Sequence, residues 1–207
     1  MEPDAVEIRV LGCLIEKQRT TPDVYPLTLN ALRLACNQST NREPVVDYDE
    51  STVRGAIDRL VQRRWATLAS WSNRRSMKYR HTLDGALGLD DAEVALLDVL
   101  MLRGPQTPGE LKGRTERLHR FADMHELNGS LARLIERRLV ARLERRPGQR
   151  EERYAQLLGG DEASETDEVP VVEPPVPAAA DSFEQRFERL EAEVAELRAE
   201  LRALRDG

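Results

Sequence analysis

The sequence predicts a mainly α-helical protein with two small β-hairpins and a C-terminal helix of the coiled-coil type. Three observations carry this prediction: an amphipathic helix that runs directly into a basic hairpin, a second copy of the same pattern, and a heptad repeat near the C-terminus. The chain has 207 residues, of which 33% are charged and 4% aromatic. This length allows one or two small domains, whose cores are expected to be aliphatic.

Residues 51–64 predict the helix on which the first copy is built. Its apolar residues recur at i, i+3, i+4, i+7 and i+8, which is the spacing of a helix with one face on a core. They are Val53, Ala56, Ile57, Leu60 and Val61. A predicted hairpin follows, with arms at 65–71 and 77–83 and an arginine-rich turn at 72–76. A helix that leads into a basic hairpin indicates the recognition helix and wing of a winged helix, a variant of the helix-turn-helix.

Two further helices are expected before this one. The first covers Asp4–Gln18 and ends at Thr20-Thr21-Pro22-Asp23, because proline disfavours a helical residue before it. The second begins near Pro26, and the loop after it is expected to include a short strand at Val45-Val46.

The two cysteines are expected to be buried free thiols. Cys13 and Cys36 lie in apolar helical patterns and lack Cys-x-x-Cys spacing, which disfavours a disulfide or a metal site.

The pattern repeats after Leu83. An offset of 86 residues places Thr21-Pro22 on Thr107-Pro108, and an offset of 74 places the arginines at 59, 63 and 64 on those at 133, 137 and 138. A second hairpin is expected at 139–144 and 151–158, around a Pro-Gly turn at 147–148. The sequence therefore predicts two copies of one small domain, at 1–83 and 84–158.

The remainder of the chain differs in composition. Residues 159–181 are acidic and rich in proline, which predicts a linker without a core of its own. Apolar residues then alternate at steps of 4 and 3, which predicts a coiled coil at 182–207 and a homodimer. They are Phe183, Phe187, Leu190, Val194, Leu197, Leu201 and Leu204. The segment has only about three heptads, so the sequence does not decide whether the two helices of the dimer run parallel or antiparallel. A single helix that folds back onto its own domains is the alternative to a dimer.

The charge distribution permits a nucleic-acid partner without requiring one. The net charge is −6 overall, but +3 before residue 159 and −9 from there on. On the two helices and their hairpins, polar and basic side chains could contact phosphates or base edges. They are Arg54, Arg59, Arg63, Arg74, Arg75, Lys78 and Arg80 in the first copy, and Asn128, Ser130, Arg133, Arg137, Arg145, Arg146 and Arg150 in the second.

Acidic residues on the same helices favour a second hypothesis. The helix predicted at 51–64 carries acidic residues at its start and on its surface, namely Asp49, Glu50 and Asp58. Carboxylates next to a phosphate are unfavourable. The chain would then be a protein-interaction scaffold, similar in plan to the tandem winged-helix subunits of bacterial chromosome-segregation complexes. A continuous basic face favours DNA binding, and a face interrupted by carboxylates favours the scaffold.

No motif for an enzyme, a cofactor or a metal is recognised. His125-Glu126 lacks the second histidine of the His-Glu-x-x-His zinc motif, since position 129 is glycine, and no Gly-rich phosphate loop occurs. The histidines are expected to be surface or boundary residues. The acidic N-terminus does not resemble a signal peptide, and the apolar run at 94–102 is too short to span a bilayer, so a cytoplasmic protein that does not insert in a membrane is expected.

The loop after the second predicted helix is unusually specific in its residues. Asn37-Gln38 and Asn41-Arg42-Glu43 could cap that helix and fasten the long loop, or they could line a surface for a partner or ligand. Residue type alone does not separate these alternatives.

The chain also resembles the YceH-like family of bacterial proteins of unknown function. The matching strings in the first copy are Val10-Leu11-Gly12-Cys13-Leu14, Glu16-Lys17-Gln18, Thr20-Thr21-Pro22-Asp23, Tyr25-Pro26-Leu27, Leu29-Asn30-Ala31, Ala35-Cys36-Asn37-Gln38 and Asn41-Arg42-Glu43-Pro44-Val45. In the second copy they are Ala92-Glu93-Val94-Ala95-Leu96, Arg103-Gly104, Gln106-Thr107-Pro108-Gly109-Glu110-Leu111 and Pro147-Gly148. The resemblance implies tandem winged helices, a bacterial source and dimerisation, and it supplies no catalytic or binding residues.

Overall fold

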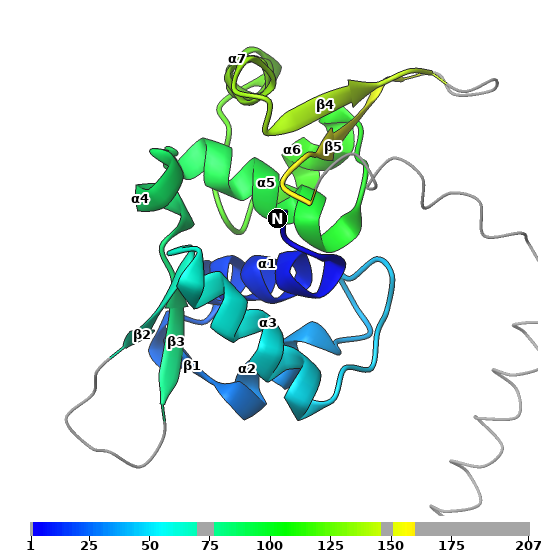
Figure 1. Ribbon diagram of the computed structural model, residues 1–207. Helices are drawn as coiled ribbons and strands as arrows, with labels where there is room; N and C mark the ends of the chain where they lie inside the picture. The colour runs from blue at the N-terminus through cyan, green and yellow to red at the C-terminus, as the bar shows by residue number, and fades with distance from the viewer. Residues whose placement is uncertain (1, 70–76, 146–150, 160–207) are drawn as a thin grey trace, which may run out of the picture. The chain divides into compact units, whose positions relative to one another are not determined.

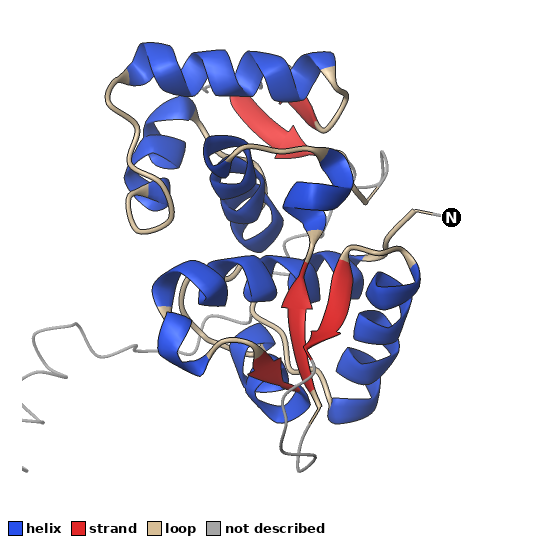
Figure 2. Cartoon of the chain, turned by 90° about the vertical axis from the view of Figure 1, so that its left-hand side faces the viewer, coloured by secondary structure: helices blue, strands red, loops and turns tan. Residues whose placement is uncertain are grey.

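The computed structural model describes residues 2–69, 77–145 and 151–159, which are mainly helical with small antiparallel β-sheets (Figures 1 and 2). The first repeat contains α1 (Ala5–Thr20), a 3₁₀ turn η1 (Pro22–Val24), β1 (Leu27–Thr28), α2 (Leu29–Cys36), α3 (Glu50–Gln62), β2 (Ala66–Ala69) and β3 (Lys78–His81). The second contains α4 (Leu83–Leu87), α5 (Asp91–Arg103), α6 (Pro108–Thr115), α7 (Met124–Glu136), β4 (Val140–Leu143) and β5 (Arg153–Gln156).

Both repeats contain a run of three helices followed by a hairpin, α1-α2-α3 with β2-β3 and α5-α6-α7 with β4-β5, and the short α4 precedes the second run. Equivalent side chains begin the first helix of each run. Asp4 and Asp90 form capping boxes with Glu7 and Glu93 at the starts of α1 and α5. Because each carboxylate accepts a hydrogen bond from a backbone N–H that has no partner within the helix, these boxes define where the helices start. The helix predicted at 51–64 is confirmed as α3, which ends at Gln62, and its equivalent 74 residues later is confirmed as α7.

Two local predictions are wrong. The second helix begins at Leu29 rather than near Pro26, because Leu27 and Thr28 form a strand that pairs with Tyr79 and Lys78. The sheet order is therefore β1-β3-β2, with β2 and β3 antiparallel from Ala66 opposite His81 to Ala69 opposite Lys78. Val45-Val46 forms no strand, since it lies in the loop before α3, where Val45 is 58% exposed and packs against neither of the described sheets. The predicted turns at 72–76 and 147–148, and the segment from 160 onward, lie outside the described residues.

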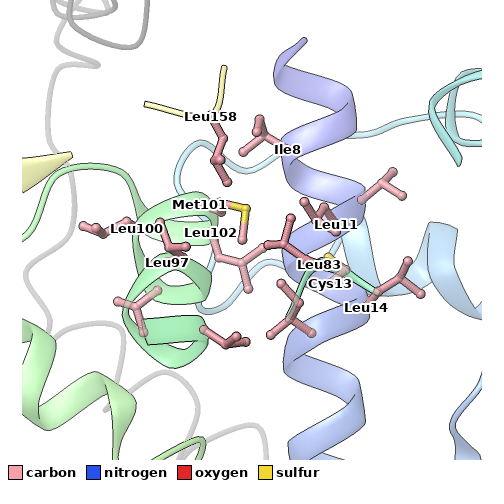
Figure 3. Packing of buried hydrophobic residues seen from close by; sticks show 14 of the residues in the cluster. Ile8, Leu11, Cys13, Leu14, Leu83, Leu97, Leu100, Met101, Leu102 and Leu158 are labelled. Atoms are coloured by element: carbon pink, nitrogen blue, oxygen red, sulfur yellow. The ribbon is translucent and has the colours of Figure 1, made fainter. Parts of the chain in front are cut away.

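The equivalent first helices of the two repeats, α1 and α5, pack against each other in the core (Figures 1 and 3). Every residue of α5 from 92 to 102 is buried, and so is every residue of α1 from 7 to 15. A helix that is apolar around its whole circumference is buried on all sides. Leu11 and Leu14 of α1 and Leu97, Leu100 and Leu102 of α5 belong to one hydrophobic cluster, so the two repeats share a core.

A glycine sets the close approach of these two helices. A Cβ atom added to Gly12 would lie 2.8 Å from Cδ2 of Leu102 and 2.9 Å from its Cγ. Such distances are shorter than carbon–carbon contacts in packed interiors, which are about 3.5–4.0 Å. Any larger residue at position 12 would therefore push α1 away from α5.

The cysteines are free and buried, as predicted. Among the described residues, no helix combines the length and the apolar composition needed to cross a membrane.

Candidate nucleic-acid interface and the contact between the repeats

Two arginines of α3 that were predicted to contact nucleic acid bind carboxylates of α1. Arg59 donates from Nε to Glu7 Oε2 at 3.0 Å and from Nη2 to Asp4 Oδ2 at 2.6 Å, and Arg63 Nε lies 3.0 Å from Glu7 Oε1. The Glu7 side chain is 2% exposed. The hydrogen bond that Arg59 donates to Glu7, assisted by the nearby Asp4, raises the pKa of Arg59.

The second repeat contains the same arrangement on equivalent residues. Arg133 of α7 lies 3.0 Å from Glu93 Oε1 and 2.8 Å from Asp90 Oδ2, and Arg137 Nη1 lies 3.5 Å from Glu93 Oε2. Arg137 also donates to the backbone carbonyls of residues 87 and 88. In each repeat a capping-box glutamate therefore ties the two helices together, α3 to α1 and α7 to α5. The offsets of 86 and 74 residues relate the members of the two groups to each other, but they do not predict that the acidic and basic members meet.

The exposed face of α3 has mixed charge. Arg54 pairs with Glu50 one turn earlier, at 2.6 Å, and both side chains are about half exposed. Asp49, at the N-cap of α3, and Asp58, one turn after Arg54, are also exposed. Carboxylates therefore interrupt the basic surface along this helix.

The outer face of the first sheet is basic. Because side chains alternate along a strand, Tyr79 and His81 of β3 point into the core while Lys78 and Arg80 lie on the other face. The strand partners place Thr28, Thr67 and Ala69 on that outer face beside them. Within the described residues, neither Lys78 nor Arg80 has a carboxylate within ion-pairing distance.

Of the remaining residues predicted in the second repeat, the structure describes three: one is exposed, one is buried and one is paired with a carboxylate. Asn128 is exposed on α7, but Ser130 is 1% exposed and its Oγ donates to the carbonyl of residue 126. Arg145 Nη2 lies 3.5 Å from Glu152 Oε1. Arg74, Arg75, Arg146 and Arg150 lie outside the described residues, as do the seven apolar residues predicted for dimerisation.

Sequence reasoning missed a buried polar cluster where α1, α5 and the α2–α3 loop meet. Arg42, whose side chain is fully buried, donates to both carboxylate oxygens of Glu16 at 3.1 and 2.6 Å and to the carbonyl of Ala35 at 3.1 Å. Burial alone would raise the pKa of Glu16, but the bonds from Arg42 outweigh it and the pKa is lowered. Arg42 thereby fastens the loop to α1.

Asp98 of α5 lies close to this cluster and is 1% exposed. Its Oδ1 has no hydrogen-bond partner among the described residues. Burial raises the pKa of Asp98 well above its ordinary value, and the negative charge of Glu16 adds to the shift, while Arg42 and Lys17 oppose it.

The side-chain amides at the start of the α2–α3 loop fasten this loop, which is the first of the two alternatives that the sequence left open. Asn37 donates to the carbonyl of Tyr48 at 2.8 Å and accepts from its N–H at 2.9 Å. Gln38 accepts from Arg42 at 2.9 Å. Arg9 of α1 donates to the carbonyls of Cys36 and Pro44 from below the same loop. Asn37 and Gln38 are therefore structural.

The described residues contain no group of three or more histidine, cysteine, aspartate or glutamate side chains placed to hold a metal ion. The expectation for the histidines is wrong for His81, which is 6% exposed, because β3 is the central strand and directs this residue inward.

Comparison with known proteins places this geometry in a family. A family model described as "Protein of unknown function, DUF480" matches residues 4–149. The "UPF0502 protein YceH" of Salmonella newport is 45% identical over 210 residues, covering 98% of this chain and 96% of the relative. The proteins of the same name in Salmonella enteritidis and Salmonella paratyphi B match to the same extent. The chain belongs to the UPF0502, or YceH, family.

Proposed function

We propose that this protein is a non-enzymatic, homodimeric tandem winged-helix protein of the transcription-regulator type, which binds duplex DNA through its first repeat. The order of three helices followed by a hairpin supports the winged-helix assignment of each repeat, and in the first repeat the two-residue strand β1 adds a third strand to the sheet. The second repeat then supports the first through the shared α1–α5 core.

The outer face of the first sheet carries the proposal. Lys78 and Arg80 stand on it without carboxylate partners among the described residues, next to the hydroxyls of Thr28 and Thr67. Ammonium, guanidinium and hydroxyl groups are the side-chain donors that bind phosphate oxygens in protein–DNA complexes. The chain continues from this face into the arginine-rich 72–76 segment. Because Arg59 and Arg63 are engaged by Glu7, the sheet replaces α3 as the main contact surface.

The alternative, a protein-docking scaffold, is favoured by one specific observation on α7. Its exposed side carries the uncharged Asn128, Gly129, Ala132 and Ile135 together with His125 and Glu136, and Ile135 is 37% exposed. A helix face with small residues, an exposed isoleucine and a carboxylate suits contact with another protein better than contact with phosphates.

Reversing the charges of Lys78 and Arg80 to glutamate is expected to weaken DNA binding at least tenfold. Fluorescence anisotropy on random duplex DNA across a salt series measures this, and the log–log slope should fall by about 2 if two phosphate contacts are lost. Arg117→Glu with Arg120→Glu is the matched control, since both arginines are exposed in the second repeat. Equal losses in the two double variants, or no binding of the natural protein at low salt, would reject the proposal and favour the scaffold.

Removing residues 183–207 is expected to convert a homodimer into a monomer, because this segment holds all seven residues of the predicted heptad seam. The molar mass from light scattering, with and without the segment, measures this. A dimer that persists in the shorter chain would place the interface elsewhere.

A further inference from the structure

A cavity of about 460 Å³ opens where the α2–α3 loop of the first repeat meets the second repeat. Asn41, Arg42 and Glu43 form one wall. The end of α5, the turn after it, α6 and β5 form the others, through Arg103, Pro105, Gln106, Glu110, Arg114 and Arg153. Arginine is thus the most frequent residue in its lining. Sites for small molecules commonly have volumes of about 300–1,000 Å³.

The walls of this cavity are held in place by hydrogen bonds. The N–H of Glu43 donates to the carbonyl of Leu102 at 2.8 Å, and Arg103 donates to the side chain of Asn41. The amide of Gln106, which is 3% exposed, donates from Nε2 to the carbonyls of residues 103, 104 and 105. Gly104, with φ +68°, lets the chain turn between them. The cavity is therefore formed before any ligand arrives.

Positive charge in the cavity exceeds what its own carboxylates neutralise. Glu110 is shared: its Oε1 lies 3.6 Å from Arg114 and its Oε2 lies 3.3 Å from Arg153. Arg42 is matched by Glu16, outside the cavity. Arg103 has only the neutral Asn41 as a side-chain partner in the described part of the chain. Glu43, on the rim, makes no ion pair with a described residue.

The surroundings of Arg103 are electropositive. Partial burial lowers the pKa of this guanidinium, and the charge of Arg114 lowers it further. Glu16 opposes the shift, Arg42 adds a smaller lowering, and Asp98 opposes it least. Arginines that converge on one space without enough carboxylates form a site that an anion stabilises, because each guanidinium then gains a charge-assisted hydrogen bond.

We propose that this cavity binds a small phosphate-bearing molecule, held by Arg103, Arg114 and Arg153 across the contact between the two repeats. A guanidinium group presents its N–H donors in a planar fork that matches two oxygens of a phosphate. Arg103 and Arg114 supply the free donors, while Arg153, which also donates to the carbonyl of Pro105 at 2.8 Å, closes the far side. Asn41 and Arg42 place the first repeat against the same ligand, which therefore bridges the repeats. This inference does not depend on DNA binding.

Calorimetric titration of the full chain with pyrophosphate tests the proposal, with inorganic phosphate, citrate and sodium chloride at matched ionic strength as comparisons. Pyrophosphate should bind with one site per chain, and more tightly than citrate. Arg103→Gln with Arg114→Gln should weaken this binding at least tenfold, and the corresponding double lysine variant should weaken it less. Arg117→Gln with Arg120→Gln, which removes the same charge outside the cavity, should leave it unchanged.

Three results would overturn the assignment. One is heat of binding no different from that of sodium chloride. The second is citrate binding as tightly as pyrophosphate, which would indicate a carboxylate ligand instead. The third is unchanged affinity in a folded Arg103→Gln, Arg114→Gln protein, with circular dichroism confirming the fold. Because no DNA enters this titration, its failure leaves the proposed DNA contact of Lys78 and Arg80 untouched.

Discussion

Replacing Glu7 by alanine is expected to lower the free energy of unfolding by about 2–3 kcal/mol. Breaking a fully buried ion pair costs roughly 3–5 kcal/mol, and solvent screening around partly exposed partners reduces that value. The side chains of Arg59 and Arg63 are 41% and 24% exposed, whereas that of Glu7 is 2% exposed. The substitution also removes the capping-box bond to the N–H of Asp4. Glu93→Ala should have an effect of similar size in the second repeat.

Urea unfolding followed by circular dichroism measures this difference. Glu50→Ala is the matched control, because Glu50 also pairs with an arginine, Arg54, but on the exposed surface of α3. Exposed i,i+4 pairs on helices contribute only about 0.3–0.5 kcal/mol. Equal destabilisation by Glu7→Ala and Glu50→Ala would contradict a structural role for the buried carboxylate.

Replacing Asp98 by asparagine is expected to stabilise the protein at neutral pH by about 1–3 kcal/mol, because asparagine removes the cost that burial imposes on the charged carboxylate. Asp98 is 1% exposed and its Oδ1 is unpartnered among the described residues. Asparagine has nearly the same shape and carries no charge. Its amide could also donate toward the carboxylate of Glu16, which acts electrostatically on this position.

The stabilisation of the folded protein by Asp98→Asn should increase as the pH rises. Burial raises the pKa of Asp98 in the folded protein above the value of 3.8 for an ordinary aspartate. A raised pKa means that the folded state binds this proton more tightly than the unfolded state, so the contribution to stability is complete below pH 3.8. It is lost as the pH rises through the folded pKa and stays constant above it. The advantage of asparagine should therefore be absent in acid and grow toward neutral pH.

Chemical unfolding at a series of pH values, comparing Asp98→Asn with the natural protein, measures this difference. Asp58→Asn on the exposed face of α3 serves as the control and should change stability by less than about 0.5 kcal/mol at any pH. An asparagine variant that is less stable than the natural protein at neutral pH would show that the aspartate charge is compensated in the folded state.

Much of the helical architecture could be predicted from local patterns. The apolar stripe from Val53 to Val61 predicted α3, and the same spacing 74 residues later predicted α7. Local periodicity and end-capping residues act over one or two turns, so a single sequence contains them. The short strand β1 was missed, because a two-residue strand exists only through its pairing with β3.

The candidate interface was predictable in composition but not in geometry. The sequence indicated basic side chains on α3 and α7, yet Arg59 and Arg133 reach carboxylates of α1 and α5. An arginine side chain is long enough to turn toward solvent or toward a neighbouring helix, and only the position of that helix decides between them. The cavity around Arg103 was unpredictable for the same reason, since its walls come from residues between 41 and 153.

By itself, the sequence determined the amphipathic helices α3 and α7 and the hairpins that follow them, because each depends on neighbours a few residues apart, and it showed their duplication through a fixed offset. The tertiary structure alone decided that α1 packs on α5, that Gly12 admits Leu102 at that contact, and that arginines converge on a cavity between the repeats. An apolar stripe predicts that a face is covered, but the surface that covers it is selected by packing and charge between segments far apart in the chain.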